Sequence, residues 1–169
     1  MTGRAAILGL GARGADWAET CLAAGWEVTG FDPDDRAGRE IGGGAAWRRE
    51  TTISGAVKRA DWVICCLPDR IELMRSVIQR AQASAPSKAV IAVASEAHDI
   101  DAVQGCAIRP GEVFRLESTE AGDLALDVNA RNDAETRRAA TEAFAVLNAA
   151  RAVAPSSMSK SDLREAGSA

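Results

Sequence analysis

Short runs of hydrophobic residues alternate along the chain with longer segments that have hydrophobic residues at helical spacing. We expect four of the short runs to form strands buried on both faces of a sheet. These runs lie at residues 5–10, 27–31, 61–68 and 88–95. The segments predicted to be helical lie at residues 14–25, 51–60, 69–85 and 133–150. This alternation predicts an α/β fold, with a doubly wound, mostly parallel sheet and helices on both faces.

Other parts of the chain have weaker patterns. Pro33 and the aspartates around it predict a turn and the start of a helix, and the glycines at 42–44 predict a loop. We also expect a short helix at residues 99–104, less regular strands at 112–117 and 123–128, and a final strand at 151–155. Together these elements predict one domain over residues 1–155, followed by a flexible tail at residues 156–169.

Composition excludes several classes of protein. The chain has 169 residues, 47% of them hydrophobic, which suits a single globular domain. A formal net charge of −4 argues against a nucleic-acid-binding surface. We expect no membrane span and no signal peptide, because the long apolar segments that these need are missing from the sequence. The four cysteines form no CxxC pair, so we expect reduced cysteines, no metal site and a cytoplasmic location.

A glycine-rich turn follows the first predicted strand and precedes the first predicted helix. Gly9, Gly11 and Gly14 have the spacing G-x-G-x-x-G. In this context the spacing is typical of a dinucleotide-binding Rossmann domain, where the glycines allow a tight turn, approach of the diphosphate and close packing of helix on strand. The start of the helix offers free N–H groups to phosphates. We therefore predict that the cofactor contacts the whole turn, namely Gly9, Leu10, Gly11, Ala12, Arg13 and Gly14.

An acidic residue follows the second predicted strand. Asp32 stands where a dinucleotide-binding domain places the carboxylate that accepts hydrogen bonds from the adenosine ribose. This carboxylate would repel a 2′-phosphate, so the sequence predicts NAD(H) as the cofactor rather than NADP(H). Arg36 lies nearby and could weaken that preference. A flavin, S-adenosylmethionine or a vestigial site stays open as an alternative.

Several further residues resemble one family. Trp17–Ala18, Ala24–Gly25 and Phe31–Asp32–Pro33 stand at the places where the 3-hydroxyacyl-CoA dehydrogenases have similar residues, and the branch with carnitine dehydrogenase and gulonate 3-dehydrogenase is the most similar. The likeness continues through the strand at 61–68, which ends in a Leu-Pro-Asp turn. The resemblance implies an NAD-binding Rossmann domain that oxidises a 3-hydroxy group with the help of a second, helical domain. It also implies cofactor contacts from Leu67, Pro68 and Asp69.

The sequence departs from this family at the positions of the chemistry. Glu96 stands where the family has a substrate-binding serine, and Ser95 is one place earlier. The family's Gly-His-Pro-Phe-Asn-Pro motif corresponds here to residues 114–123, which have no histidine, proline or asparagine. The only histidine is His98. Ser95, Glu96 and His98 are therefore the candidate catalytic residues, and a lysine that touches the cofactor in the family is replaced by Met74.

Three hypotheses follow for the function. The first is a minimal, active NAD-dependent dehydrogenase of 3-hydroxy acids or their acyl-CoA esters. The second, which we favour, is a module that binds NAD(H) without complete catalytic machinery of its own. The third is a structural or interaction protein with a vestigial cofactor site. Because the family's cleft lies between two domains, we expect a homo-oligomer or a partner chain that supplies the helical domain.

Overall fold

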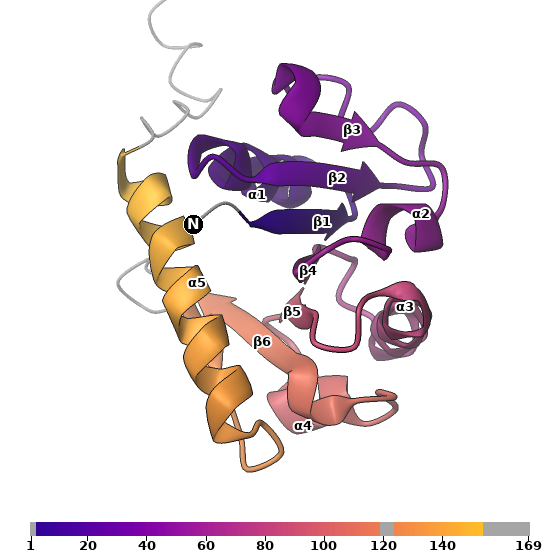
Figure 1. Cartoon of the computed structure of the whole chain (residues 1–169). Helices are drawn as coiled ribbons and strands as arrows, with labels where there is room; N and C mark the ends of the chain where they lie inside the picture. Colours follow the sequence, from indigo (N-terminus) through magenta and orange to yellow (C-terminus); the bar gives the residue numbers. More distant parts are fainter. Residues whose placement is uncertain (1–2, 119–123, 154–169) are drawn as a thin grey trace, which may run out of the picture.

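The computed structural model describes residues 3–118 and 124–153, which fold into one sheet with helices on both faces (Figure 1). The sheet has the order β3-β2-β1-β4-β5-β6-β7. Its strands are β1 (Arg4–Leu8), β2 (Glu27–Phe31), β3 (Trp47–Arg49), β4 (Trp62–Cys65), β5 (Val90–Ala94), β6 (Val113–Ser118) and β7 (Leu124–Asp127). The helices are α1 (Ala12–Ala23), α2 (Ile53–Val57), α3 (Ile71–Ser84), α4 (Ile100–Gln104) and α5 (Ala134–Val153), with short 3-10 turns η1 (Gly44–Ala46) and η2 (Pro110–Glu112).

The sheet is parallel from β3 to β6, and only β7 runs antiparallel to its neighbour β6. From β1 the chain first adds β2 and β3 on one side, and it then crosses to the other side to add β4 and β5. This reversal next to β1 is the topological switch point of a doubly wound sheet, where such folds bind ligands. The fold predicted from the sequence is confirmed.

Neighbouring residues of each strand face two different helical layers. Ala5 and Ile7 of β1 pack with residues of α1 and α5, whereas Ala6 and Leu8 pack with residues of α2, α3 and α4. All four of these β1 residues are buried. The central strands are therefore apolar throughout, because a parallel sheet that is covered on both faces has no solvent-facing side.

Two predictions of local structure are wrong, and one strand was not predicted. The turn after Pro33 does not lead into a helix, since residues 34–40 form successive turns. β3 was not predicted, because this edge strand has the sequence Trp-Arg-Arg, with no apolar run. Residues 151–153 end α5 and do not form a strand. Arg151 stabilises the helical arrangement by pairing with Asp16 of α1 at 2.7 Å and by lying over the ring of Trp17, 5.4 Å from its centre.

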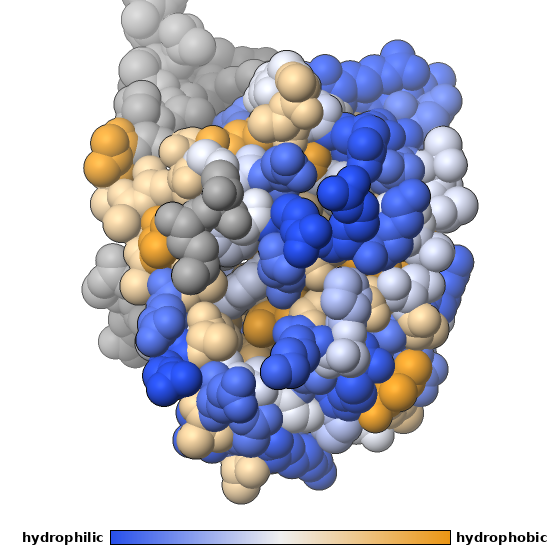
Figure 2. Space-filling model, viewed as in Figure 1, coloured by the Kyte–Doolittle hydropathy of each residue, from blue (hydrophilic) through white to orange (hydrophobic). Residues whose placement is uncertain are grey.

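The large hydrophobic residues that are exposed in the described part of the chain are few. They are Ile108, Val128, Val146 and Val153. On the face shown in Figure 2, hydrophilic residues lie over the region of β2 and β3, and the hydrophobic ones form small separate spots, some of them along α5. Among the described residues, no helix has the length and apolar character needed to cross a membrane. The predicted tail at 156–169 lies outside the described residues.

Candidate cofactor-binding site

A groove of about 770 Å³ opens at the carboxyl ends of β1, β2 and β4, at the switch point of the sheet. Nine of the ten predicted cofactor-binding residues line it: Gly9, Gly11, Ala12, Arg13, Gly14, Asp32, Leu67, Pro68 and Asp69. The tenth, Leu10, does not line the groove, because its side chain is only 1% exposed and belongs to the core. The structure thus brings together residues from three separate stretches of the sequence.

The three glycines of the turn have different geometric requirements. Gly9 has a φ of +91°, and a Cβ built there would lie 2.2 Å from the carbonyl oxygen of Cys66. A Cβ on Gly14 would lie 1.8 Å from the carbonyl oxygen of Gly9. Any residue other than glycine would therefore force the backbone to shift at both positions, for reasons internal to the fold. Gly11 is different, because a Cβ there would meet no protein atom within 4 Å.

α1 begins directly behind this turn. Gly11 is its N-cap and has no side chain that could bond the first N–H groups of the helix. The N–H groups of Ala12, Arg13 and Gly14 have no partner within the helix, since the first turn of any helix leaves its donors free. These donors and the partial positive charge of a helix N-terminus suit a phosphate group. The open space beside Gly11 gives such a group room to approach the backbone.

Asp32 is held in place at the end of β2. Its Oδ2 accepts a hydrogen bond from the backbone N–H of Leu10 at 2.7 Å, and its Oδ1 accepts one from the N–H of Asp34 at 2.8 Å. A carboxylate has about four acceptor positions, so lone pairs remain for a ligand. The bond from Leu10 ties the acidic residue directly to the glycine turn. It explains why Leu10 matters to the site although its side chain points into the core.

The opposite wall of the groove is formed by the turn after β4 and by α3. Asp69 stands at this turn and links it to the loop between β5 and α4. Its Oδ1 accepts a hydrogen bond from the Ser95 hydroxyl at 2.7 Å, and its Oδ2 accepts bonds from the N–H groups of Ala97 at 2.9 Å and Glu96 at 3.2 Å. Partial burial opposes the charge of this carboxylate and is the largest single effect on it. The hydrogen bonds together outweigh burial and lower the pKa of Asp69.

The candidate catalytic residues all lie on the loop that Asp69 holds. The Ser95 side chain is buried, and its oxygen also accepts a bond from the backbone N–H of His98 at 3.1 Å. The Nε2 atom of His98 lies 3.4 Å from the backbone carbonyl oxygen of Asp69 and 3.8 Å from its carboxylate. Glu96 is exposed, with its carboxylate 3.8 Å from the guanidinium of Arg13. None of the three lines the groove itself, but they lie beside it.

Sequence reasoning missed the contribution of α3 to the groove. Met74 is fully buried in the core and does not line the groove. The residues of this segment that line the groove are Arg70, Leu73, Val77 and Arg80. Their spacing of three, four and three residues is that of one helical stripe, and this periodicity could have identified them.

The groove offers no reactive thiol and no metal centre. Cys66 lines it, but burial is the main reason why the pKa of this thiol is raised to about 12, so the thiol stays protonated at neutral pH. All four cysteines are unpaired. No group of three histidine, cysteine, aspartate or glutamate side chains in the described part of the chain could hold a metal ion. What the groove does offer is a phosphate cradle, a fixed carboxylate and apolar walls.

A glycine turn, a free helix N-terminus and a carboxylate at the end of β2, all at the switch point, define a dinucleotide-binding Rossmann domain. Comparison with known families agrees with this geometry. Residues 4–107 match the family described as the NAD binding domain of 6-phosphogluconate dehydrogenase. The chain belongs to this family, and it is an NAD-binding domain.

Individual relatives confirm the resemblance seen in the sequence. The chain is 29% identical over 128 residues to an L-carnitine dehydrogenase/betainyl-CoA thioesterase of Ruegeria pomeroyi. This alignment covers 64% of this chain and 26% of the relative. It is 30% identical over 107 residues to an L-carnitine dehydrogenase of Mesorhizobium japonicum, with 52% of this chain and 29% of the relative covered. The alignments with these curated relatives thus span less than a third of the relatives' length.

Solved structures show the same fold at lower sequence identity. The (S)-3-hydroxybutyryl-CoA dehydrogenase of Ralstonia eutropha superimposes with a TM-score of 0.76 at 15% identity, covering 88% of this chain and 62% of that one. The 3-hydroxybutyryl-CoA dehydrogenase of Escherichia coli gives a TM-score of 0.73 at 17% identity, covering 87% and 37%.

Proposed function

We propose that the groove binds NAD(H) through the residues that line it. The backbone N–H groups of Ala12, Arg13 and Gly14 bind the diphosphate, and the α1 dipole adds a favourable partial charge. Asp32 accepts hydrogen bonds from the hydroxyls of the adenosine ribose. The observation that supports this assignment best is Gly11, because the fold itself does not require glycine there, whereas a diphosphate close to the backbone does.

The second wall gives the cofactor apolar and charged contacts. Leu67, Pro68 and Leu73 present apolar surface to the groove. Arg70 and Arg80 add positive charge on the same wall, which favours a ligand with two phosphate charges. Bound NAD supplies the hydride acceptor for an oxidation.

We propose a preference for NAD(H) over NADP(H). The Asp32 carboxylate is fixed by two backbone N–H groups and lines the groove, so a 2′-phosphate would face a like charge. Arg36 does not line the groove. Arg49, another nearby cation, donates hydrogen bonds to the backbone carbonyls of Asp32 and Asp34. Both observations leave the carboxylate as the dominant charge at this end of the site.

We propose further that the chain binds NAD(H) without complete catalytic machinery of its own. A dehydrogenase needs a base within hydrogen-bond reach of the hydroxyl that is oxidised. The Ser95 hydroxyl is buried and already donates to Asp69, so it is not available to a substrate. The exposed Glu96 and the half-buried His98 lie on the loop beside the groove.

A minimal, active dehydrogenase of 3-hydroxy acids or their acyl-CoA esters is the second candidate. One observation favours it: Arg13 lines both the groove and a smaller neighbouring cavity of about 120 Å³, which Glu96 also lines. A substrate in that cavity would therefore lie next to a carboxylate and next to the cofactor. A vestigial site is the third candidate, and the intact turn and Asp32 argue against it.

Two measurements separate these candidates. Amide NMR spectra with added NAD should show saturable shifts at Gly9, Gly11, Gly14 and Asp32. If these shifts are absent, the vestigial cofactor site is the only one of the three candidates that agrees with the result. Incubation with NAD and a panel of 3-hydroxy acids and their CoA esters should then yield no NADH. Turnover that Glu96→Gln abolishes, with NAD binding unchanged, would instead establish the minimal dehydrogenase.

A partner and a cellular compartment complete the proposal. We propose that the chain self-associates or binds a helical partner chain, and the exposed Val146 and Val153, seven residues apart on α5, support a contact at this helix. Equilibrium sedimentation that shows only monomers up to about millimolar concentration would exclude self-association. The four unpaired cysteines support a reducing, cytoplasmic environment.

A further inference from the structure

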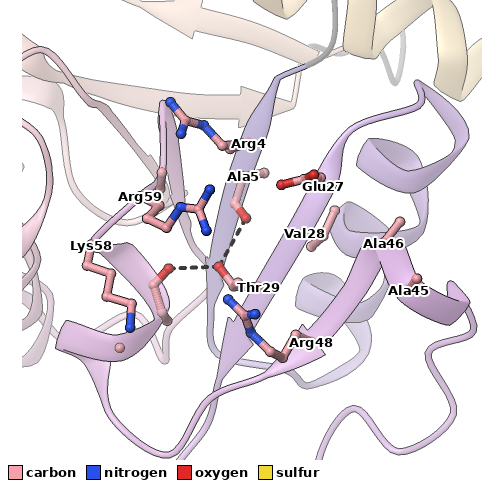
Figure 3. Close-up of a pocket in the computed structure, with 13 residues that line it drawn as sticks. Arg4, Ala5, Glu27, Val28, Thr29, Ala45, Ala46, Arg48, Lys58 and Arg59 are labelled. Carbon is pink, nitrogen blue, oxygen red and sulfur yellow. Dashed lines mark hydrogen bonds between the residues drawn. The ribbon is translucent and has the colours of Figure 1, made fainter.

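A second hollow lies at the other end of the same strands that form the cofactor groove. Its volume is about 240 Å³ (Figure 3). It is lined by the first residues of β1 and β2, whereas the groove begins at the carboxyl end of β1 with Leu8 and Gly9. On β1 the nearest lining residues of the two, Ala5 and Leu8, are three residue steps apart, which corresponds to about 10 Å. The two linings share no residue, so the hollow and the groove are separate sites.

The hollow exists because α2 is short. This helix has five residues and packs over β1 and β2, but it does not extend over the edge strand β3. Thr29 of β2 donates a hydrogen bond from its hydroxyl to the carbonyl oxygen of Ala56 at 2.7 Å, which ties the sheet to α2. Several further residues of the lining are small, namely Ala5, Ala45, Ala46, Gly55 and Ala60. Small side chains leave the space between β2, β3 and α2 open.

The sheet register places charged residues on one face of the hollow. Arg48 is the register partner of Thr29, so the two side chains project to the same face of the sheet. Arg4 is the partner of Glu27, which lies two residues before Thr29 and so shares that face. α2 ends next to this face and adds Lys58 and Arg59.

Positive charge predominates in this lining. Four cations, Arg4, Arg48, Lys58 and Arg59, face one acidic residue, Glu27. This excess occurs in a chain whose formal net charge is −4.

Two of the four cations have carboxylate partners. Arg4 pairs with Asp61 through two of its nitrogens, at 2.9 and 3.1 Å. Arg48 uses only its Nε, which donates to Glu50 at 2.7 Å, so its terminal nitrogens stay available. Lys58 and Arg59 form no ion pair and no side-chain hydrogen bond with any described residue.

Figure 3 shows how these groups lie. The guanidinium group of Arg48, from β3, lies beside Thr29, and that of Arg59, which follows α2, points toward β1. We propose that this basic hollow is a binding site for a small anion with two or more negative charges on phosphate or carboxylate groups. Guanidinium groups suit both kinds of oxyanion, since their planar N–H donors match the oxygens of either.

The test uses the full chain, with inorganic phosphate and citrate as separate probes and sodium chloride at equal ionic strength as the reference. Amide NMR spectra should show saturable shifts at Thr29, Ala46 and Gly55, with no shift at Gly11, and the shifts should persist with NADH present. The probe that saturates at the lower concentration distinguishes phosphate from carboxylate recognition. Shifts that sodium chloride reproduces, or that grow without saturation to about 50 mM, would overturn the proposal.

Charge variants test which residues bind the anion. Lys58→Gln combined with Arg59→Gln should weaken binding about tenfold, on the basis of about threefold for each exposed charge. Lys88→Gln combined with Arg138→Gln removes the same charge from exposed sites elsewhere and should leave binding unchanged. Glu27→Gln should tighten binding about threefold, since it removes the acidic residue of the lining. Equal effects of the two double variants, or no gain with Glu27→Gln, would show that the hollow is not a specific site.

Discussion

The Gly11→Ala variant tests whether glycine is needed at position 11 for cofactor binding or for folding. Gly11 has a φ of −67° and a ψ of −168°, which alanine adopts without strain, and the added methyl group meets no protein atom within 4 Å. Alanine is a poorer N-cap than glycine, but it also lowers the entropy of the unfolded chain, so the two effects of about 0.5 kcal/mol each offset one another. The free energy of unfolding should therefore change little.

Binding of NADH should respond very differently. The methyl group would occupy the space in which the diphosphate approaches the backbone. Loss of two hydrogen bonds to a charged group, at about 1.5 kcal/mol each, amounts to a decrease in affinity of about 100-fold. Isothermal titration calorimetry with NADH measures this loss, and thermal unfolding checks that the variant is folded.

Gly14→Ala is the matched control. The same methyl group would lie 1.8 Å from the carbonyl oxygen of Gly9, so the turn must shift. We expect a cost of about 3 kcal/mol and a melting temperature about 9 °C lower. If Gly11→Ala bound NADH as tightly as the original chain, or if it unfolded as readily as Gly14→Ala, the assignment of Gly11 to the diphosphate would be wrong.

Three further predictions concern the carboxylates and the loop that holds the candidate catalytic residues. Asp32→Asn should weaken NADH more than NADPH in parallel titrations, since it removes the charge that disfavours a 2′-phosphate, and equal losses would contradict the role of Asp32. The pKa of Asp69 is lowered in the folded chain, so its contribution to stability is complete at neutral pH and is lost as the pH falls below its ordinary value of 3.8. In urea titrations, the free energy of unfolding of Asp69→Asn should therefore fall less steeply below about pH 4 than that of the original chain. An unchanged dependence on pH would argue against these hydrogen bonds. Ser95→Ala should cost about 1–3 kcal/mol of unfolding free energy, because it removes a buried hydroxyl bonded to Asp69; a loss of NADH affinity without loss of stability would contradict this structural role.

The sequence predicted the first half of the fold well because its signals are local. The apolar run before Gly9 and the change to helical spacing after Gly14 identify β1, the turn and α1 without any knowledge of distant residues. The strands β4 and β5 are apolar throughout, as buried parallel strands must be.

The predictions that failed depend on contacts between distant parts of the chain. β3 exists because the edge of β2 pairs with a polar segment, and polar edge strands have no distinctive pattern. The end of α5 is fixed by the pairing of Arg151 with Asp16, which lie far apart in the sequence. Propensity alone could not indicate that this segment continues as a helix.

The candidate site shows the same division. The sequence indicated the glycine turn and Asp32, since both belong to one local motif. It did not indicate that the N–H of Leu10 bonds Asp32, nor that Asp69 bonds Ser95 on the next loop. Each of these contacts joins the segments that follow two neighbouring strands, which lie far apart in the sequence. Arg70 and Arg80 could be assigned to the groove only once the burial of Met74 was known, since burial decides which side of α3 faces the groove.

The central claim is that the groove at the switch point binds NAD(H), and direct calorimetric titration of the chain with NADH tests it most simply. We predict saturable binding of one NADH per chain with a Kd below about 1 mM, in the range in which enzymes bind their ligands. Excess NAD should displace the bound NADH. A titration that shows no saturable heat up to several times that concentration, with a chain that thermal unfolding proves to be folded, would contradict the account.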